Sequence, residues 1–189
     1  MHLMCDIETL STQPNAAILS IGACVFDRDG VGKTFYRVIS EDTITGHIDP
    51  KTVLWWFKQS DAARGEFTKG HGRPHTEVLS DFAAFCATES GGKELHPWSN
   101  GAGFDIVILE SAYAAANMRT PWKYNGPLDV RTIMWEACAR VNKAEGIEHH
   151  ALDDAINQAK AVLKALHASG RWTPSVPPMS VEKLLEAVK

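Results

Sequence analysis

The sequence predicts a mixed sheet with helices packed against it, in a domain of the α/β or α+β class. Two observations support this prediction. Three strand-like segments follow one another within the first 40 residues, and helix-like and strand-like segments alternate from there to residue 166. Strands joined by short turns pair antiparallel, whereas strands joined through helices pair parallel, so one sheet should contain both kinds of pairing.

Apolar segments rich in β-branched and aromatic residues predict three strands near the N-terminus, over residues 3–8, 16–27 and 33–39. The turn-forming residues Asp27 to Gly30 stand between the second and third segments. Because Asp and Gly favour tight turns, these two strands should form a hairpin.

Helical patterns dominate the rest of the chain. Pro50 suits the first turn of a helix, because its fixed φ is already helical. The strongest pattern places Leu152, Ile156 and Leu163 on one apolar stripe. In order, we expect helices over 52–59, 75–88 and 104–116, strands over 94–99 and near 128, and helices over 131–141 and 151–166.

Length and composition are typical of one folded domain. The chain has 189 residues, of which 44% are hydrophobic and 22% charged, which excludes a disordered or fibrous protein. We expect residues 1–170 to form the domain and the proline-rich residues 171–189 to form a tail with a short helix. The four cysteines form no C-x-x-C pair, which favours buried free thiols over a zinc site.

Nothing in the sequence indicates a membrane or a secretory route. No apolar run approaches the roughly 18 residues that span a bilayer. The start MHLMCDIETL has neither a basic region nor a long apolar core, so we expect a cytoplasmic protein. The formal net charge of -4 gives no general reason to expect a polyanionic partner.

Acidic residues interrupt or begin several apolar segments. Asp6 and Glu8 are two residues apart and therefore lie on one face of a strand. Asp105 opens a helix, where stabilising the helix start is the ordinary role of an acid. Taken singly, each of these acids is more often structural than catalytic.

The segment His149-His150-Ala-Leu-Asp153-Asp154 opens the last helix with two histidines and two acids. Together with the earlier acids it supplies four carboxylates, and hard oxygen ligands without cysteine suit Mg²⁺ or Mn²⁺. Two such ions about 3.5–4 Å apart stabilise the attacking and leaving oxygens of a phosphodiester. A neighbouring histidine could take the proton from the attacking water. Helical periodicity alone slightly favours Asp153 over Asp154 as the ligand.

Three motifs contain these residues: Asp6-x-Glu8, Asn100-x-x-x-Phe104-Asp105 and His149-x-Ala151-Leu152-x-Asp154-Ala155. They resemble the motifs of the DEDDh 3'-5' exonucleases, which include polymerase proofreading subunits, ribonuclease T and oligoribonuclease. The resemblance spans roughly residues 3–166 and includes the D-x-R-T segment at Asp129. The segments DIETLSTQPNAAILSIGACVFD and TVLWWFKQSDAAR are similar to a phage and bacterial branch, which contains a phage exodeoxyribonuclease and a mycobacterial ribonuclease.

The resemblance implies a ribonuclease H-like fold of the α/β class, with a central mixed five-stranded sheet flanked by helices. It implies hydrolysis of single-stranded DNA or RNA from the 3' end to nucleoside 5'-monophosphates, with two Mg²⁺ ions that Mn²⁺ can replace. Family spacing pairs His149, as the general base, with Asp154, and the alternative base His150 matches this spacing less well. Several relatives are dimers, which leaves a homodimer as an open expectation. The metal ligands it implies are Asp6, Glu8, Asp105 and Asp154.

Four further residues are candidates for contact with the substrate. By resemblance, Thr9 and Leu10 follow the first motif and line the nucleotide site, and Asn100 orients the loop of the second. Trp55 and Trp56 diverge by about 100° on a helix, so at most one of them can face a base. We take Trp56 as that candidate, although core packing is the commoner role for such a pair.

Two other functions fit parts of the pattern. A silent binding module on the same fold would need neither the metal nor Asp6, and a full set of self-repelling carboxylates argues against it. A hydrolase of small phosphate esters would act on mononucleotides but not on oligomers. The choice between DNA and RNA depends on how the site treats a 2'-hydroxyl, which the sequence does not report.

Overall fold

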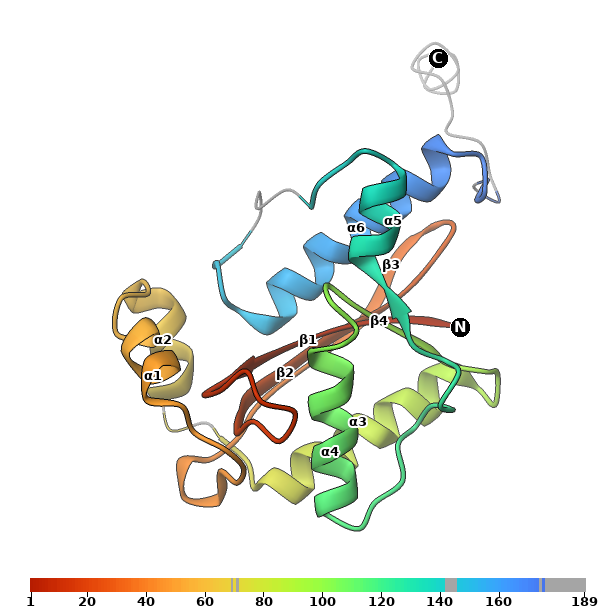
Figure 1. Ribbon diagram of the computed structural model, residues 1–189. Helices are drawn as coiled ribbons and strands as arrows, with labels where there is room; N and C mark the ends of the chain where they lie inside the picture. The colour runs from red at the N-terminus through yellow and green to blue at the C-terminus, as the bar shows by residue number, and fades with distance from the viewer. Residues whose placement is uncertain (69, 71, 142–145, 174, 176–189) are drawn as a thin grey trace, which may run out of the picture.

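A five-stranded mixed sheet forms the centre of the computed structural model, which describes residues 1–68, 70, 72–141, 146–173 and 175 (Figure 1). The strand order is β3-β2-β1-β4-β5. The central strand β1 pairs antiparallel with β2 and parallel with β4, so the predicted mixture of pairings is confirmed. The strands are β1 His2–Thr9, β2 Ile18–Asp27, β3 Gly30–Val38, β4 His96–Ser99 and β5 Leu128–Asp129.

Helices cover both faces of the sheet (Figure 1). One face packs against α3 (His75–Ser90) and α4 (Asp105–Ala115), and the other against α5 (Val130–Glu136) and α6 (Ala151–Ala168). The helices α1 (Pro50–Trp56) and α2 (Asp61–Thr68) lie beyond the end of β1. The turn at Glu41–Thr43 is a short 3₁₀ helix.

The alternation of side chains along β1 decides which helix each residue faces. Leu3, Cys5 and Ile7 belong to the core formed with α3 and α4, whereas Met4 belongs to the core formed with α5 and α6. Successive side chains of a strand point to opposite faces. Asp6 and Glu8 therefore share the face of Met4 and lie on the side of α6.

Two sequence expectations need correction. The helix predicted over 131–141 ends at Glu136, because Cys138 adopts a left-handed conformation (φ 49°) and the N–H of Ala139 bonds back to the carbonyl of Met134. Cys138 is also exposed, whereas the other three cysteines are buried as expected. The helix α2 was not predicted, because its sequence DAARGEFT contains a glycine and has little apolar content.

The predicted helix of the tail falls within residues 176–189 and lies outside the described residues. In the ranges that the structure does describe, no helix is long and apolar enough to cross a membrane.

Candidate active site

The close approach of α6 to the sheet brings the first and third motifs together. Asp6 pairs in register with Gly22 on β2. A Cβ atom at Gly22 would lie 2.2 Å from the backbone of Ala151 and Leu152, so the first turn of α6 rests on a position without a side chain. Only glycine permits this contact, which places the start of α6 beside the carboxylates of β1.

The two histidines before α6 have different surroundings. His150 is the N-cap: its Nδ1 accepts the N–H of Asp153 at 3.4 Å, and its ring packs 4.3 Å from that of Tyr36. Asp153 in turn accepts the N–H of Ile147 at 2.8 Å. His150 and Asp153 therefore hold the start of the helix.

His149 and Asp154 instead lie next to the acids of the first motif. One ligand atom from each of Glu8, His149 and Asp154 lies within 4.8 Å of the others. His149 has a left-handed backbone (φ 63°), an uncommon conformation for a residue other than glycine. Its ring lies edge-on to Trp55 with centroids 4.7 Å apart. A strained conformation at this point is consistent with a functional role.

Asp105 is the first residue of α4 and is 4% exposed. Its Oδ1 accepts the N–H of Ile7 at 3.2 Å, which ties it to the strand between Asp6 and Glu8. The loop before it is held by Asp129, which caps α5 and accepts the N–H of Ala102 at 3.0 Å. The second motif therefore reaches the same end of β1.

Burial and mutual repulsion make these carboxylates reluctant to ionise. Burial, followed by the charges of Asp154 and Asp105, raises the pKa of Glu8 to about 8. Burial raises the pKa of Asp105 to about 6, against a hydrogen bond from Ile7. The pKa of Asp6 lies well above its usual range, mainly through burial and then through its acidic neighbours, and burial also raises that of Asp154. Divalent cations at this point would remove the repulsion.

The donor set fits hard divalent cations. It consists of carboxylate oxygens and one imidazole, with no thiolate among the described residues that meet there. Magnesium and manganese prefer such oxygen ligands, whereas a structural zinc site would use cysteine or several histidines.

Two cavities adjoin the carboxylates. One of about 320 Å³ is lined by Asp6, Asn100, His149 and Asp154 together with the 146–148 segment. The other, of about 470 Å³, is lined by Glu8 and by a set of mainly aromatic and polar residues. Its further lining residues are Ile7, Thr9, Thr12, Asp49, Lys51, Thr52, Trp55, Trp56 and Phe104. Acids of the same cluster therefore face two neighbouring spaces.

The four substrate candidates take different places. Asn100 and Thr9 line these cavities, although the hydroxyl of Thr9 donates to Ser11 O at 2.7 Å. Trp56 also lines a cavity but is only 6% exposed, and its indole N–H donates to Thr9 O at 2.8 Å. Leu10 packs against the small cluster around Trp56 and lines neither cavity. Trp55, which the sequence did not single out, is 40% exposed.

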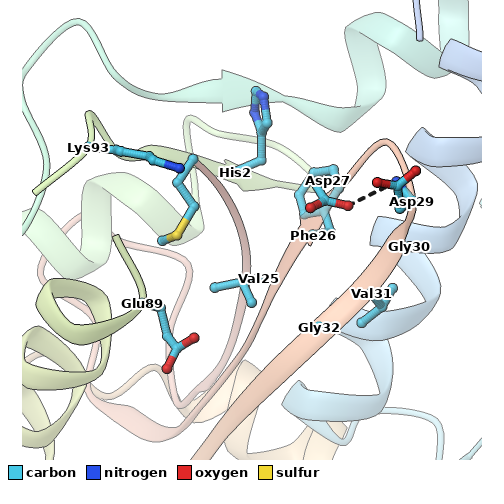
Figure 2. A pocket seen from close by; sticks show the side chains of 11 residues that line it. His2, Val25, Phe26, Asp27, Asp29, Gly30, Val31, Gly32, Glu89 and Lys93 are labelled. Carbon is cyan, nitrogen blue, oxygen red and sulfur yellow. Dashed lines mark hydrogen bonds between the residues drawn. The ribbon is translucent and has the colours of Figure 1, made fainter. Parts of the chain in front are cut away.

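A larger cavity of about 580 Å³ lies at the other end of β1, around Met1 and His2. Figure 2 shows the β2–β3 hairpin on one side of it and Glu89 and Lys93 on the other. Its acids are spread over the hairpin turn and α3, so it lacks the converging carboxylates of the other end. This larger cavity therefore lies away from the candidate active site.

The fold and the converging motifs resemble those of the DEDDh exonucleases. Three solved structures share the fold at low identity. The nuclease domain of 3'hExo, a DEDDh family member bound to rAMP, matches with a TM-score of 0.61 at 12% identity, covering 93% of this chain and 96% of that one. Product-bound exonuclease I matches with a TM-score of 0.61 at 16% identity, covering 90% of this chain and 44% of that one. Exonuclease X in complex with 5' overhanging duplex DNA matches with a TM-score of 0.56 at 16% identity, covering 92% of this chain and 95% of that one.

The chain belongs to the family of the 3'-5' exoribonuclease Rv2179c-like domain, whose model matches residues 1–166. The resemblance to DEDDh enzymes and the expected fold are thereby confirmed. The chain spans less than half the length of exonuclease I. No curated protein matches the sequence significantly.

Proposed function

We propose that this exonuclease releases nucleoside 5'-monophosphates from single-stranded 3' ends with two divalent cations and a histidine base. The observation that supports the proposal is the meeting of Glu8, His149 and Asp154 within 4.8 Å, beside the half-buried Asp6 and the buried Asp105. Three segments far apart in sequence contribute to that meeting, which a purely structural role for the acids would not require.

Within this proposal, Asp6, Glu8, Asp105 and Asp154 would hold two Mg²⁺ ions, for which Mn²⁺ substitutes. When bound, the ions supply positive charge to the attacking and leaving oxygens of the phosphodiester. His149 accepts the proton of the attacking water at its imidazole nitrogen, and its packing against Trp55 fixes the ring for this step.

RNA is the first substrate to test, because the family is described by an exoribonuclease. DNA remains the alternative, since exonuclease X was solved with duplex DNA. The homodimer and the cytoplasmic location stay predictions.

The test uses matched single-stranded RNA and DNA oligonucleotides, each labelled at the 5' or the 3' end, with Mg²⁺ or Mn²⁺. We expect stepwise shortening from the 3' end and release of nucleoside 5'-monophosphates. Asp154→Asn should abolish most of the activity, whereas Asp153→Asn, which keeps an oxygen for the N–H of Ile147, should retain it. A purified wild-type protein that binds no divalent cation and degrades neither oligonucleotide would refute the proposal.

A further inference from the structure

Gln158 connects the last helix to the first strand inside the candidate active site. It lies on α6, four residues and thus about one turn after Asp154, on the same face of the helix. Its side chain is 4% exposed, and its Nε2 donates to Oδ1 of Asp6 at 2.7 Å. The hydrogen bond joins residues that are 152 positions apart.

The orientation of the amide follows from this partner. If the amide were reversed, its oxygen would face the ionised carboxylate of Asp6 that a cation requires, and two acceptors would meet without a proton. With the N–H toward Asp6, Oε1 is buried and has no hydrogen-bond partner among the residues that the structure describes. Gln158 lines the same cavity as Asp6, His149 and Asp154.

A space-filling role does not account for this arrangement. An apolar side chain of similar volume would pack between α6 and β1 without a buried acceptor that lacks a partner, which is costly in a protein interior. The amide is explained only if both its N–H and its oxygen make hydrogen bonds. One end already binds Asp6, and the other is available to a proton donor that enters the cavity.

We propose that Gln158 is a positioning residue of the cation site. Through Nε2 it holds the carboxylate of Asp6 in one orientation, and through Oε1 it accepts a hydrogen bond from water that enters the cavity with the cation. The inference rests on the proposed function, because it assigns Asp6 to the cation. Partners that orient metal ligands in this way typically contribute about 10–100-fold to metal affinity or activity.

The test measures Mn²⁺ binding to the full chain without nucleic acid, by electron paramagnetic resonance of the free ion and by calorimetry. Gln158→Met keeps the volume of the side chain and removes both the donor and the acceptor of the amide. We expect Mn²⁺ affinity to fall by about 10–100-fold. In the RNA assay kcat should fall while KM for the oligonucleotide stays unchanged, because the proposed role of Gln158 acts through Asp6 and not through the oligonucleotide.

Two further variants complete the test. Gln158→Asn withdraws the amide by one methylene and should also weaken Mn²⁺ binding, which keeps the inference testable if the Met variant folds poorly. Lys164→Met, on the exposed side of the same helix, should bind Mn²⁺ as the wild type does.

The outcomes separate the two proposals. A wild-type protein that binds no Mn²⁺ would overturn the proposed function together with this inference. If the wild type binds Mn²⁺ and both Gln158 variants bind it equally well with an unchanged kcat, only the positioning role is overturned.

Discussion

Two adjacent histidines at the start of α6 differ in what they contact. His149 lies beside Glu8 and Asp154, whereas His150 caps the helix and packs on Tyr36. Family spacing pairs His149 with Asp154, and the structure brings these two residues together. The left-handed backbone of His149 is the local cause, because it turns consecutive side chains toward different surroundings.

The same substitution at each histidine should separate their roles. Asparagine tolerates a left-handed backbone and is also a good N-cap, so both variants should fold. We expect His149→Asn to lower kcat by about 10²–10⁴-fold, the usual contribution of a general base, whereas His150→Asn should keep most of the activity. The measurement is kcat on a labelled oligonucleotide, with circular dichroism as the control for folding. Equal losses in the two variants would contradict the assignment of the base.

At the scale of elements, the contact between β2 and α6 determines whether the site forms. Gly22→Ala would force its new methyl group into the backbone of Ala151 and Leu152. We expect a loss of about 1–3 kcal/mol in the free energy of unfolding, as for overpacked cores, together with weaker Mn²⁺ binding. Denaturant unfolding and calorimetry measure the two effects.

Gly32→Ala is the matched control for this prediction. Gly32 lies on the neighbouring strand β3, and a Cβ atom there would meet the side-chain methyl of Val25 at 2.9 Å and, in ordinary contact, its carbonyl oxygen at 3.6 Å. That methyl can shift, so metal binding should stay unchanged. Mn²⁺ binding that weakens as much in the Gly32 variant as in the Gly22 variant would argue against the specific role of the β2–α6 contact.

The sequence predicted the type and order of most elements because their patterns are strong, as in β2 and α6. It placed the end of α5 poorly. The stop depends on a left-handed Cys138, where a glycine would have signalled it. It also could not show that Gly22 supports α6, because that contact joins segments about 130 positions apart and leaves no local pattern.

At the scale of the whole molecule, the buried acids should make stability depend on pH. The pKa of Glu8 is raised by burial to about 8, from 4.5. A carboxyl with a raised pKa stabilises the fold fully below its unfolded value, and this stability is lost as pH rises through the folded value. The free energy of unfolding should fall by about 1.4 kcal/mol for each pH unit between the unfolded and the folded pKa of Glu8.

The acids dominate toward the upper part of the window from pH 6.5 to 8. Burial lowers the pKa of His2 to about 4 and also lowers that of His75, and their opposing contributions, which increase with pH, level off above the unfolded value of 6.5. We expect the Tm of the metal-free protein to fall between pH 6.5 and 8, by about 2–4 °C for each kcal/mol lost. Added Mg²⁺ should raise the Tm more at pH 8 than at pH 6.5. A metal-free Tm that rises across this window would contradict the raised pKa.

The candidate site was predictable from the sequence to the extent that its motifs are local. Asp6, Glu8, Asp105, His149 and Asp154 lie within short patterns. Gln158 was missed as a site residue, because a glutamine within a helix has an ordinary structural explanation, and Trp56 was chosen over its neighbour Trp55. Only the three-dimensional contacts, with Asp6 in one case and His149 in the other, single them out.

The position of α6 at the end of the chain order has a consequence during synthesis. A ribosome releases the chain from its N-terminus, so Asp6, Glu8 and Asp105 emerge long before His149 and Asp154. The backbone at Gly22 also stays uncovered until Ala151 and Leu152 have been synthesised and pack against it. Within the proposed function, a nascent chain therefore lacks a complete candidate site until His149 and Asp154 have been translated.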